Sequence, residues 1–294
     1  MIYILHHGNC PDGFGAAWAA YKYFETKRAA EYITYIPVLY DQPLPDMPEL
    51  NRNSIVYILD FSYDSDTLIK LAEQVDLVRV IDHHLTAQKK LEKYVAWFMR
   101  TNPGKEVPVI VDTSKSGAVL AWEYFHPQKP VPDILKYVQD RDLRQWQLVD
   151  SKEINLALSA RARSFVNWNA FIDNSKILTL IEEGKAILRY VEKQVENLAK
   201  HVNFVYIDNW TRVPVVNTAL FQSEVGEYLI DKYPDAPFAM TRFQRSDGKW
   251  QHGLRSRGEF DVSEIAEKMG GGGHKHAAGF VTTCVTDRYK NDKN

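Results

Sequence analysis

Apolar residues in the first half of the chain form short continuous runs that alternate with segments of helical spacing. The runs over residues 1–7, 32–39, 54–62 and 77–84 are typical of buried strands, whereas 14–25 and 65–75 are predicted as helices. Asp64 or Ser65 is expected to cap the second of these helices at its N-terminus. Strands that alternate with helices favour an α/β fold with a doubly wound, mainly parallel sheet.

The rest of the chain predicts a long connecting helix and a second, smaller α/β domain. Helices are predicted over residues 114–125 and 131–143, the latter with Pro132 near its start. Residues 176–200 carry a single apolar stripe, which is typical of one long helix. Strands are then expected over residues 202–207, 212–218, 237–243 and 250–257, with helices over 223–233 and 261–269. We therefore expect an N-terminal domain over residues 1–175, a linker helix over 176–201 and a C-terminal domain over 202–294.

Composition narrows the classes of function. The 294 residues suffice for two domains, and 36 basic against 38 acidic residues give a net charge of −2. This balance excludes a strong basic field for long nucleic acid, but it is compatible with a short anionic ligand. Two cysteines without a CxxC pair argue against a disulfide framework or a structural zinc finger. With no signal peptide and no apolar run long enough to span a bilayer, the sequence predicts a soluble, cytoplasmic protein that does not engage a membrane.

Three predicted strands end in side chains that are common metal ligands. These side chains are His6 and His7 after the first strand, Asp60 after the third, and Asp82, His83 and His84 after the fourth. Ligands of doubly wound sheets bind beyond the C-terminal ends of the strands, so we expect these groups to converge. A carboxylate beside two imidazoles suits a metal ligand with an orienting partner, although a polar helix start is the alternative. Taken singly, Asp60 also fits a turn or an N-cap.

Two further segments carry polar groups that a cation would stabilise. Cys10 and Asp12 follow His6 by four and six residues, in a turn that leads from a strand into a helix. Asp140 and Asp142 lie near the C-terminal end of a predicted helix, where carboxylates oppose the helix dipole and a compensating cation is favourable. Solvated polar turns are the alternative in both segments.

Four successive glycines, Gly270 to Gly273, precede His274 in "GGGGHKHAAGF". Such a run loses much backbone entropy on folding and commonly marks close approach of the backbone to another group, often a phosphate. A Walker loop is excluded because no Gly-Lys-Ser/Thr follows, and a dinucleotide fingerprint is disfavoured because a helix precedes the run. A flexible loop is the alternative.

In this order and spacing, "HHGNCPDG", Asp60, "DHH" at 82–84, Asp140 and "GGGGHKHAAG" resemble the DHH phosphoesterase superfamily. The match is to the oligoribonuclease-like or exopolyphosphatase-like branch, which has a glycine-rich DHH-associated C-terminal domain. The resemblance implies two divalent cations, usually Mn²⁺ with Mg²⁺ as an alternative, in the N-terminal catalytic domain. It assigns metal ligation to His6, Asp12, Asp60, His83 and Asp140, with Asp60 bridging. It implies that His84 and Asp82 are catalytic. It also implies that the substrate phosphate is bound by Arg255, Gly272, Gly273 and His274.

Cys10 departs from the family, which usually has an aspartate at that position. A thiolate ligand would shift preference away from Mn²⁺ or Mg²⁺, whereas a cysteine that does not ligate would leave one metal site weaker. The expected function is hydrolysis of short phosphodiesters, such as oligonucleotides of a few residues or dinucleotides, by a two-metal-activated hydroxide. Hydrolysis of pyrophosphate, polyphosphate or mononucleotides is the alternative within this class. A nucleotide-binding regulatory module with impaired catalysis is the alternative from another class.

Overall fold

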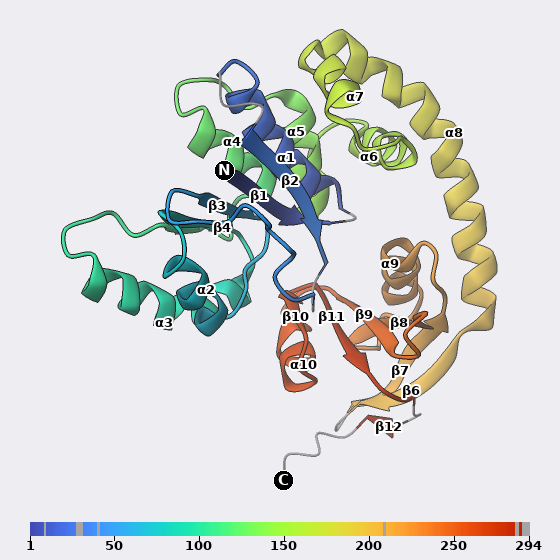
Figure 1. The fold of residues 1–294 in the computed structure, drawn as a ribbon. Coiled ribbons are helices and arrows are strands. Elements are labelled where there is room, and N and C mark those ends of the chain that lie inside the picture. The colour runs from blue at the N-terminus through green and yellow to red at the C-terminus, as the bar shows by residue number, and fades with distance from the viewer. Residues whose placement is uncertain (9, 28–31, 40–41, 208–209, 286–287, 290–294) are drawn as a thin grey trace. The chain divides into compact units, whose positions relative to one another are not determined.

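The computed structural model describes residues 1–8, 10–27, 32–39, 42–207, 210–285 and 288–289. The chain forms two compact units, Met1–Leu188 and Arg189–Asn294 (Figure 1). Helix α8 (Asn174–Leu198), which was predicted over residues 176–200, contains the boundary between the units. Among the described residues, no helix combines the length and apolar character that crossing a membrane requires.

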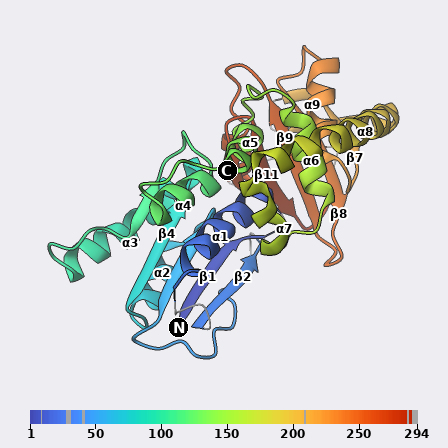
Figure 2. The ribbon, with the colours of Figure 1, turned by 90° about the horizontal axis from the view of Figure 1, so that it is seen from above.

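The first unit is built on a five-stranded sheet in which every strand is parallel to its neighbours, as predicted. Its strands are β1 (Ile2–His7), β2 (Ile33–Val38), β3 (Ile55–Leu59), β4 (Leu77–Asp82) and β5 (Val109–Val111). Their spatial order is β2-β1-β3-β4-β5. Figure 2 shows this sheet from above, with β1, β2 and β4 labelled. In this doubly wound order the connections reverse direction between β1 and β3, and ligands bind beside the strand ends at that point.

Helices cover both faces of this sheet. One face carries α1 (Pro11–Phe24), α4 (Gly117–Phe125) and α5 (Asp133–Asp142), and the other carries α2 (Ser65–Ala72) and α3 (Leu85–Thr101). Trp18 of α1 stacks on Trp122 of α4 with ring centroids 5.6 Å apart, in the buried core of the first face. The short helices α6 (Ser151–Ala160) and α7 (Phe165–Asn169) precede α8.

The start of α2 resolves the predicted choice of cap. Asp64 is the N-cap, and its carboxylate accepts a hydrogen bond from the backbone N–H of Thr67 at 3.0 Å. Ser65 lies inside the helix, where its Oγ donates to the carbonyl of Lys90 and accepts from the N–H of Tyr94. The serine therefore joins α2 to α3, a helix that the sequence analysis did not predict.

The second unit contains a mixed seven-stranded sheet of order β10-β11-β9-β8-β7-β6-β12. Its strands are β6 (Asn203–Ile207), β7 (Trp210–Asn217), β8 (Phe238–Gln244), β9 (Trp250–Ser256), β10 (Gly272–His274), β11 (Ala277–Thr282) and β12 (Arg288–Tyr289). Helix α9 (Gln222–Lys232) connects the parallel pair β7 and β8, and α10 (Ser263–Lys268) follows β9. These two sheets with their helices confirm the predicted two-domain α/β fold class.

The glycine run is part of the second sheet and is not a flexible loop. Gly272 and Gly273 lie in β10, which pairs antiparallel with β11. A Cβ atom on Gly271 would overlap the carbonyl oxygen of Gly279, and Gly273 has a φ of 146°. Only glycine fits both the close approach and the positive φ, so these residues let two backbones pack closely.

Candidate metal centre

The candidate ligands converge beyond the C-terminal ends of β1, β3 and β4. The strands are in register there, because His6 pairs with Leu59 and Leu59 pairs with Ile81. Asp60 follows directly after β3, is only 2% exposed, and has a φ of 66°. Aspartate tolerates this left-handed conformation better than most residues. A Cβ on Gly117 would overlap the Asp60 carboxylate, so the helix α4 begins with the one residue that leaves room for it.

One group of three potential ligand atoms includes the Oδ2 atom of Asp60. His7 Nδ1 lies 3.5 Å from this oxygen, and Cys10 Sγ also lies 3.5 Å from it. Cys10 Sγ and His7 Nδ1 are 3.2 Å apart. Cys10 is the N-cap of α1, and its sulfur accepts a hydrogen bond from the N–H of Gly13 at 3.1 Å. We call these three residues the His7 subsite.

A second group surrounds the Nε2 atom of His83, which is 1% exposed. The distances from Nε2 are 3.1 Å to Asp60 Oδ1, 3.5 Å to Asp142 Oδ2 and 3.6 Å to Asp12 Oδ2. We call these four residues the His83 subsite. Asp60 thus presents one carboxylate oxygen to each subsite, which is the geometry that a bridging ligand requires.

Asp12 is held in place by the start of another helix. Its two carboxylate oxygens accept hydrogen bonds from the backbone N–H groups of Gly117 at 2.7 Å and Ala118 at 3.0 Å. These are the first two residues of α4, where the positive end of the helix dipole favours a carboxylate. The orientation of Asp12 is therefore fixed by α4.

The His83 subsite gathers three buried carboxylates around one imidazole. Burial, together with the carboxylates of Asp60 and Asp142, raises the pKa of Asp12 well above its usual value. Burial also raises the pKa of Asp142, in spite of the charge of His83. Asp60 Oδ1 and Asp142 Oδ2 are buried and accept no hydrogen bond of ordinary geometry within the described part of the chain. Such a site fits divalent cations, because a buried carboxylate is costly unless it is paired or coordinates a metal.

The pKa values of Asp60 and His83, the other two residues of the His83 subsite, are also shifted by their neighbours. Burial acts to raise the pKa of Asp60, but the neighbouring imidazoles of His7 and His83 outweigh this effect and lower it. Burial acts to lower the pKa of His83, but the carboxylates of Asp60, Asp142 and Asp12 outweigh it and raise the pKa well above the usual value. A cation bound at this place would compete with the proton of His83.

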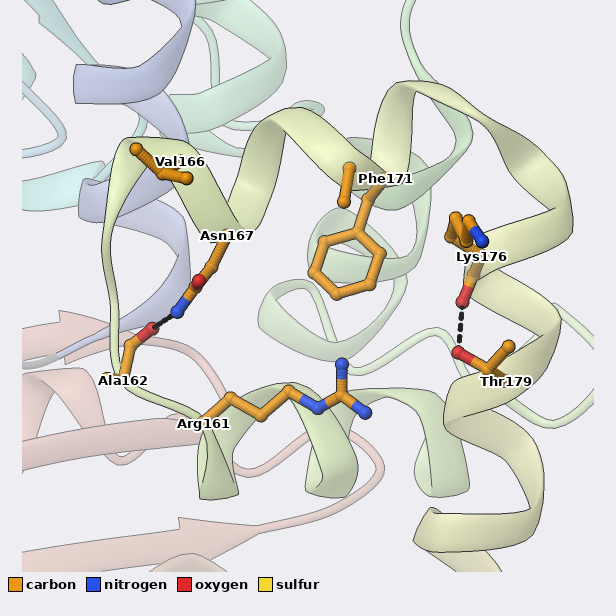
Figure 3. Close-up of a pocket in the computed structure, with 8 residues that line it drawn as sticks. Arg161, Ala162, Val166, Asn167, Phe171, Lys176 and Thr179 are labelled. Atoms are coloured by element: carbon orange, nitrogen blue, oxygen red, sulfur yellow. Dashed lines mark hydrogen bonds between the residues drawn. The ribbon is translucent and has the colours of Figure 1, made fainter.

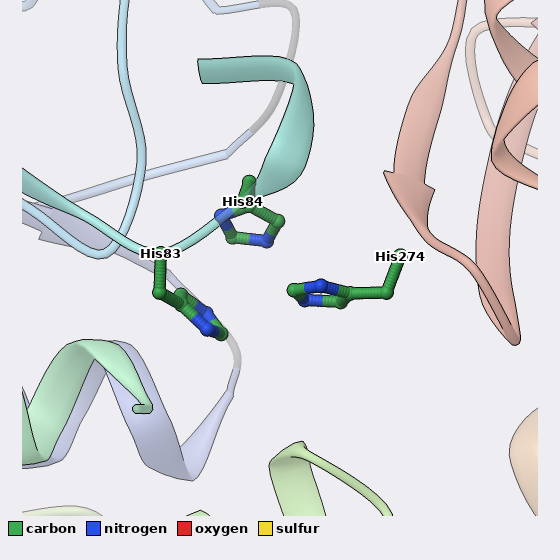
Figure 4. Close-up of side chains that lie close together, drawn as sticks. All are labelled: His83, His84 and His274. Atoms are coloured by element: carbon green, nitrogen blue, oxygen red, sulfur yellow. The ribbon is translucent and has the colours of Figure 1, made fainter. Parts of the chain in front are cut away.

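Asp82 orients the imidazole of His84, which lies next to His83 (Figure 4). The Asp82 carboxylate is 1% exposed and lies 2.7 Å from His84 Nδ1, so the ring donates to it through that nitrogen. The same oxygen accepts from the backbone N–H groups of His83 at 2.7 Å and His84 at 3.1 Å. Although burial acts to raise the pKa of Asp82, the charge and hydrogen bond of His84 lower it. The arrangement directs Nε2 of His84 away from Asp82.

Two residues assigned from the resemblance do not join either subsite. His6 is buried, its Nδ1 lies 3.1 Å from the carbonyl of His7, and burial lowers its pKa to about 4. Asp140 accepts hydrogen bonds from the N–H groups of Gln147 at 2.8 Å and Leu148 at 3.3 Å, and so holds the turn after α5. His7 and Asp142 lie in the two subsites, whereas the metal ligation assigned to His6 and Asp140 stays a prediction.

Sequence reasoning considered His7 and Asp142 but did not select them. His7 follows His6 directly at the end of β1, and Asp142 follows Asp140 by two residues at the end of α5. The helical period turns residues 140 and 142 to opposite sides of α5, but it does not say which side faces the strand ends.

In the second unit, Arg255 lies on the face of β9 that packs against α9. Its guanidinium donates hydrogen bonds to Ser223 Oγ at 2.6 Å and to the carbonyl of Leu254 at 2.8 Å. Gly226 of α9 makes room for it, since a Cβ there would lie 2.7 Å from Arg255 Cγ. Gly272 and Gly273 lie in β10, and His274 is the last residue of that strand.

A surface hollow of about 390 Å³ lies in the first unit between α6, α7 and α8 (Figure 3). Arg161, Asn167, Phe171 and Lys176 are among the residues that line it. The guanidinium of Arg161 bonds to Glu183, so its charge is already balanced. None of its lining residues belongs to the two subsites.

Comparison with known proteins places the chain in a family. Residues 223–288 match the DHHA1 domain. The uncharacterized protein R106 of Acanthamoeba polyphaga mimivirus is 30% identical, over 96% of this chain and 68% of the viral protein. Oligoribonuclease NrnB of Bacillus subtilis is 23% identical, over 96% of this chain and 73% of NrnB. The fold resembles the crystal structure of an exopolyphosphatase-related protein from Bacteroides fragilis, with a TM-score of 0.51, 12% identity, and coverage of 97% of this chain and 88% of that one. The chain belongs to the DHH phosphoesterase family, in the branch with a DHHA1 domain.

Proposed function

We propose that this protein hydrolyses short phosphodiesters, such as oligonucleotides of a few residues or dinucleotides, with two divalent cations. The observation that carries the proposal is the split of the Asp60 carboxylate, which turns Oδ2 to the His7 subsite and Oδ1 to the His83 subsite. The name of the relative NrnB, an oligoribonuclease, supports this class of substrate.

The ligands suit the proposed cations. Oxygen and imidazole donors from Asp12, Asp60, His83 and Asp142 are typical of Mn²⁺ and Mg²⁺ sites. When bound, a pair of divalent cations activates water at neutral pH and neutralises charge on the phosphoryl oxygens. Asp60 would hold both positions at a fixed separation, and α4 would keep Asp12 in place through its first two N–H groups.

The polar groups beside the ligands would act on the substrate. Asp82 holds His84 by Nδ1, so Nε2 is the atom we assign to the scissile phosphate or to the leaving oxygen. A protonated imidazole at that place would stabilise developing negative charge. In the second unit we assign the substrate phosphate to Arg255, Gly272, Gly273 and His274.

Two arginines of the first unit strengthen the preference for an anionic substrate. Arg163 is near enough to His6 for its positive charge to lower the pKa of that histidine, after the larger effect of burial. Burial and the neighbouring charge of Arg141 lower the pKa of Arg163 itself. Arg163, which lies near the candidate metal ligands, would pair with a substrate phosphate.

A panel of substrates assayed with Mn²⁺ tests the proposal. It comprises short RNA oligonucleotides, a cyclic dinucleotide, 3′-phosphoadenosine 5′-phosphate, pyrophosphate and polyphosphate. We expect the highest kcat/KM for short oligonucleotides or linear dinucleotides, and little cleavage of long duplex. Preferred cleavage of pyrophosphate or polyphosphate would contradict the proposal of short phosphodiesters and make the protein an inorganic-phosphate-chain hydrolase. No metal-dependent turnover of any of them would leave a nucleotide-binding regulatory module.

A further inference from the structure

We propose that the two metal subsites of this chain differ in chemistry, so that it forms a mixed-metal centre. The His7 subsite, made of His7, Cys10 and Asp60, would take a thiophilic divalent cation such as Zn²⁺. The His83 subsite would take Mn²⁺ or Mg²⁺. The inference rests on the proposed two-metal centre and adds the identity of the ion at each position.

The three donor atoms of the His7 subsite form a triangle of the right size. Its sides are 3.2 Å from Cys10 Sγ to His7 Nδ1, and 3.5 Å from Asp60 Oδ2 to each of the other two atoms. Zn²⁺ bonds of ordinary length at tetrahedral angles would place sulfur, nitrogen and oxygen ligands about 3.3–3.6 Å from one another. The side chains are therefore already arranged as one face of a tetrahedron.

The two subsites offer different donor atoms, which favour different kinds of cation. The His7 subsite offers a sulfur and an imidazole nitrogen beside one carboxylate. The His83 subsite offers three carboxylates and one imidazole. Thiolate ligands favour zinc and other soft cations, whereas carboxylates suit Mn²⁺ and Mg²⁺.

Helix capping does not account for a cysteine at position 10. Cys10 has an extended backbone, with φ −123° and ψ 152°, and its sulfur accepts from the N–H of Gly13. Serine, threonine, aspartate and asparagine are the side chains that cap helices well, and any of them would fill this role. The hydrogen bond does fix Sγ beside His7 and Asp60, and although burial raises the pKa of the thiol, a bound cation would displace its proton.

Cobalt(II) alone is the first probe, because a cobalt–thiolate bond produces a charge-transfer absorption in the near ultraviolet. We expect this band in the metal-free full chain after Co²⁺ is added, and also in Cys284→Ser, which removes the other cysteine. Cys10→Ser and Cys10→Asp should lack it. Asp142→Asn should keep it, because Asp142 belongs to the other subsite. Absence of the band in the wild-type chain would overturn the inference, as would its persistence in Cys10→Ser.

Zinc is the second probe. One equivalent of Zn²⁺ added before Co²⁺ should abolish the band in the wild-type chain, because zinc would fill the thiolate subsite first. The preference for Zn²⁺ over Mn²⁺, measured as bound metal after dialysis against both, should fall about tenfold or more in Cys10→Asp. An undiminished band after zinc addition would show that zinc binds elsewhere.

The outcomes separate this inference from the proposed function. Phosphodiester hydrolysis with Mn²⁺ in a chain that shows no cobalt–thiolate band would overturn the mixed-metal centre alone. A clear band in a chain that hydrolyses none of the phosphodiesters would overturn the substrate class alone.

Discussion

The Oδ1 atom of Asp60 lies 3.1 Å from Nε2 of His83, and the other oxygen of the same carboxylate faces the His7 subsite. A residue that bridges two positions is required by both. Asp60 holds this place with a left-handed backbone, at a φ of 66°.

Replacing Asp60 separates its role as a ligand from its role in the backbone. Asparagine adopts a positive φ readily, so Asp60→Asn should keep the fold while losing bound metal and more than about 100-fold in activity, beyond the effect typical of a residue that only supports a ligand. Asp60→Ala should lose the same amount of activity. Its free energy of unfolding should also fall by about 1 kcal/mol, because alanine is strained at a positive φ. Metal content, turnover and denaturant unfolding decide this. Near-full activity of Asp60→Asn in Mn²⁺ would refute the bridging role.

Asp140 and Asp142 allow a matched pair of substitutions. Asp142→Asn should reduce bound metal and turnover, because Asp142 Oδ2 lies 3.5 Å from His83 Nε2. Asp140→Asn should retain the metal but cost about 1–3 kcal/mol of stability, because its charged oxygens hold the N–H groups of Gln147 and Leu148. Metal analysis beside thermal unfolding distinguishes them. The reverse pattern would restore Asp140 as the ligand.

Asp82 is expected to act through His84. Removing the imidazole in His84→Ala should lower kcat by about 10²–10⁴-fold, the range usual for a positioned acid or base. Asp82→Asn should lower kcat by a smaller factor and leave KM and bound metal unchanged, because an amide oxygen can still accept from the N–H groups of His83 and His84 but holds Nδ1 less strongly than a carboxylate. If Asp82→Asn instead releases metal, Asp82 supports the ligand His83 and not the catalytic imidazole.

Gly226 offers a test of Arg255 that leaves the arginine in place. In Gly226→Ala the new Cβ would meet Arg255 Cγ at 2.7 Å and displace the guanidinium from Ser223. We expect KM to rise about 10–100-fold, which corresponds to the loss of one charged hydrogen bond, with metal content unchanged. Alanine raises helix propensity, so a loss of helix α9 is not expected. Ser223→Ala, which removes the bond without a clash, should raise KM to a smaller extent. An unchanged KM in both variants would remove Arg255 from the substrate site.

The second unit should lose stability as the pH falls. Burial and the nearby charge of Arg242 lower the pKa of His252 to about 4 from 6.5. In the unfolded chain His252 therefore binds a proton below pH 6.5, whereas in the folded chain it binds one only below about pH 4. Stability is complete above that window and falls by about 3 kcal/mol across it.

His252→Gln is the variant that isolates this effect. Its amide can still bond to Thr282 Oγ1, which lies 2.9 Å from His252 Nε2, but it does not titrate. The difference in unfolding free energy between pH 7 and pH 4.5 should therefore be smaller in the variant than in the wild-type chain. An equal pH dependence of the unfolding free energy in both chains would show that the pKa of His252 is not lowered by folding.

By itself, the sequence determined the two-domain α/β class and the places where chemistry would gather. Continuous apolar runs specify buried strands, and polar residues directly after them must lie at one edge of a parallel sheet. This local reasoning selected Asp60, His83 and Asp82, together with Asp12, which the structure places in the first turn of α1; their roles at the site stay predictions. It missed α3 and the β10–β11 pair, although Leu91, Tyr94 and Phe98 of α3 are buried at helical spacing.

Only the tertiary structure decided which member of each neighbouring pair faces the cluster. Successive residues of a strand point to opposite faces, and residues two apart on a helix point to opposite sides. Which of His6 and His7, and which of Asp140 and Asp142, lies in the two subsites therefore depends on how β1 and α5 pack in the first unit. That packing is set by contacts between residues far apart in the chain, which no local pattern records.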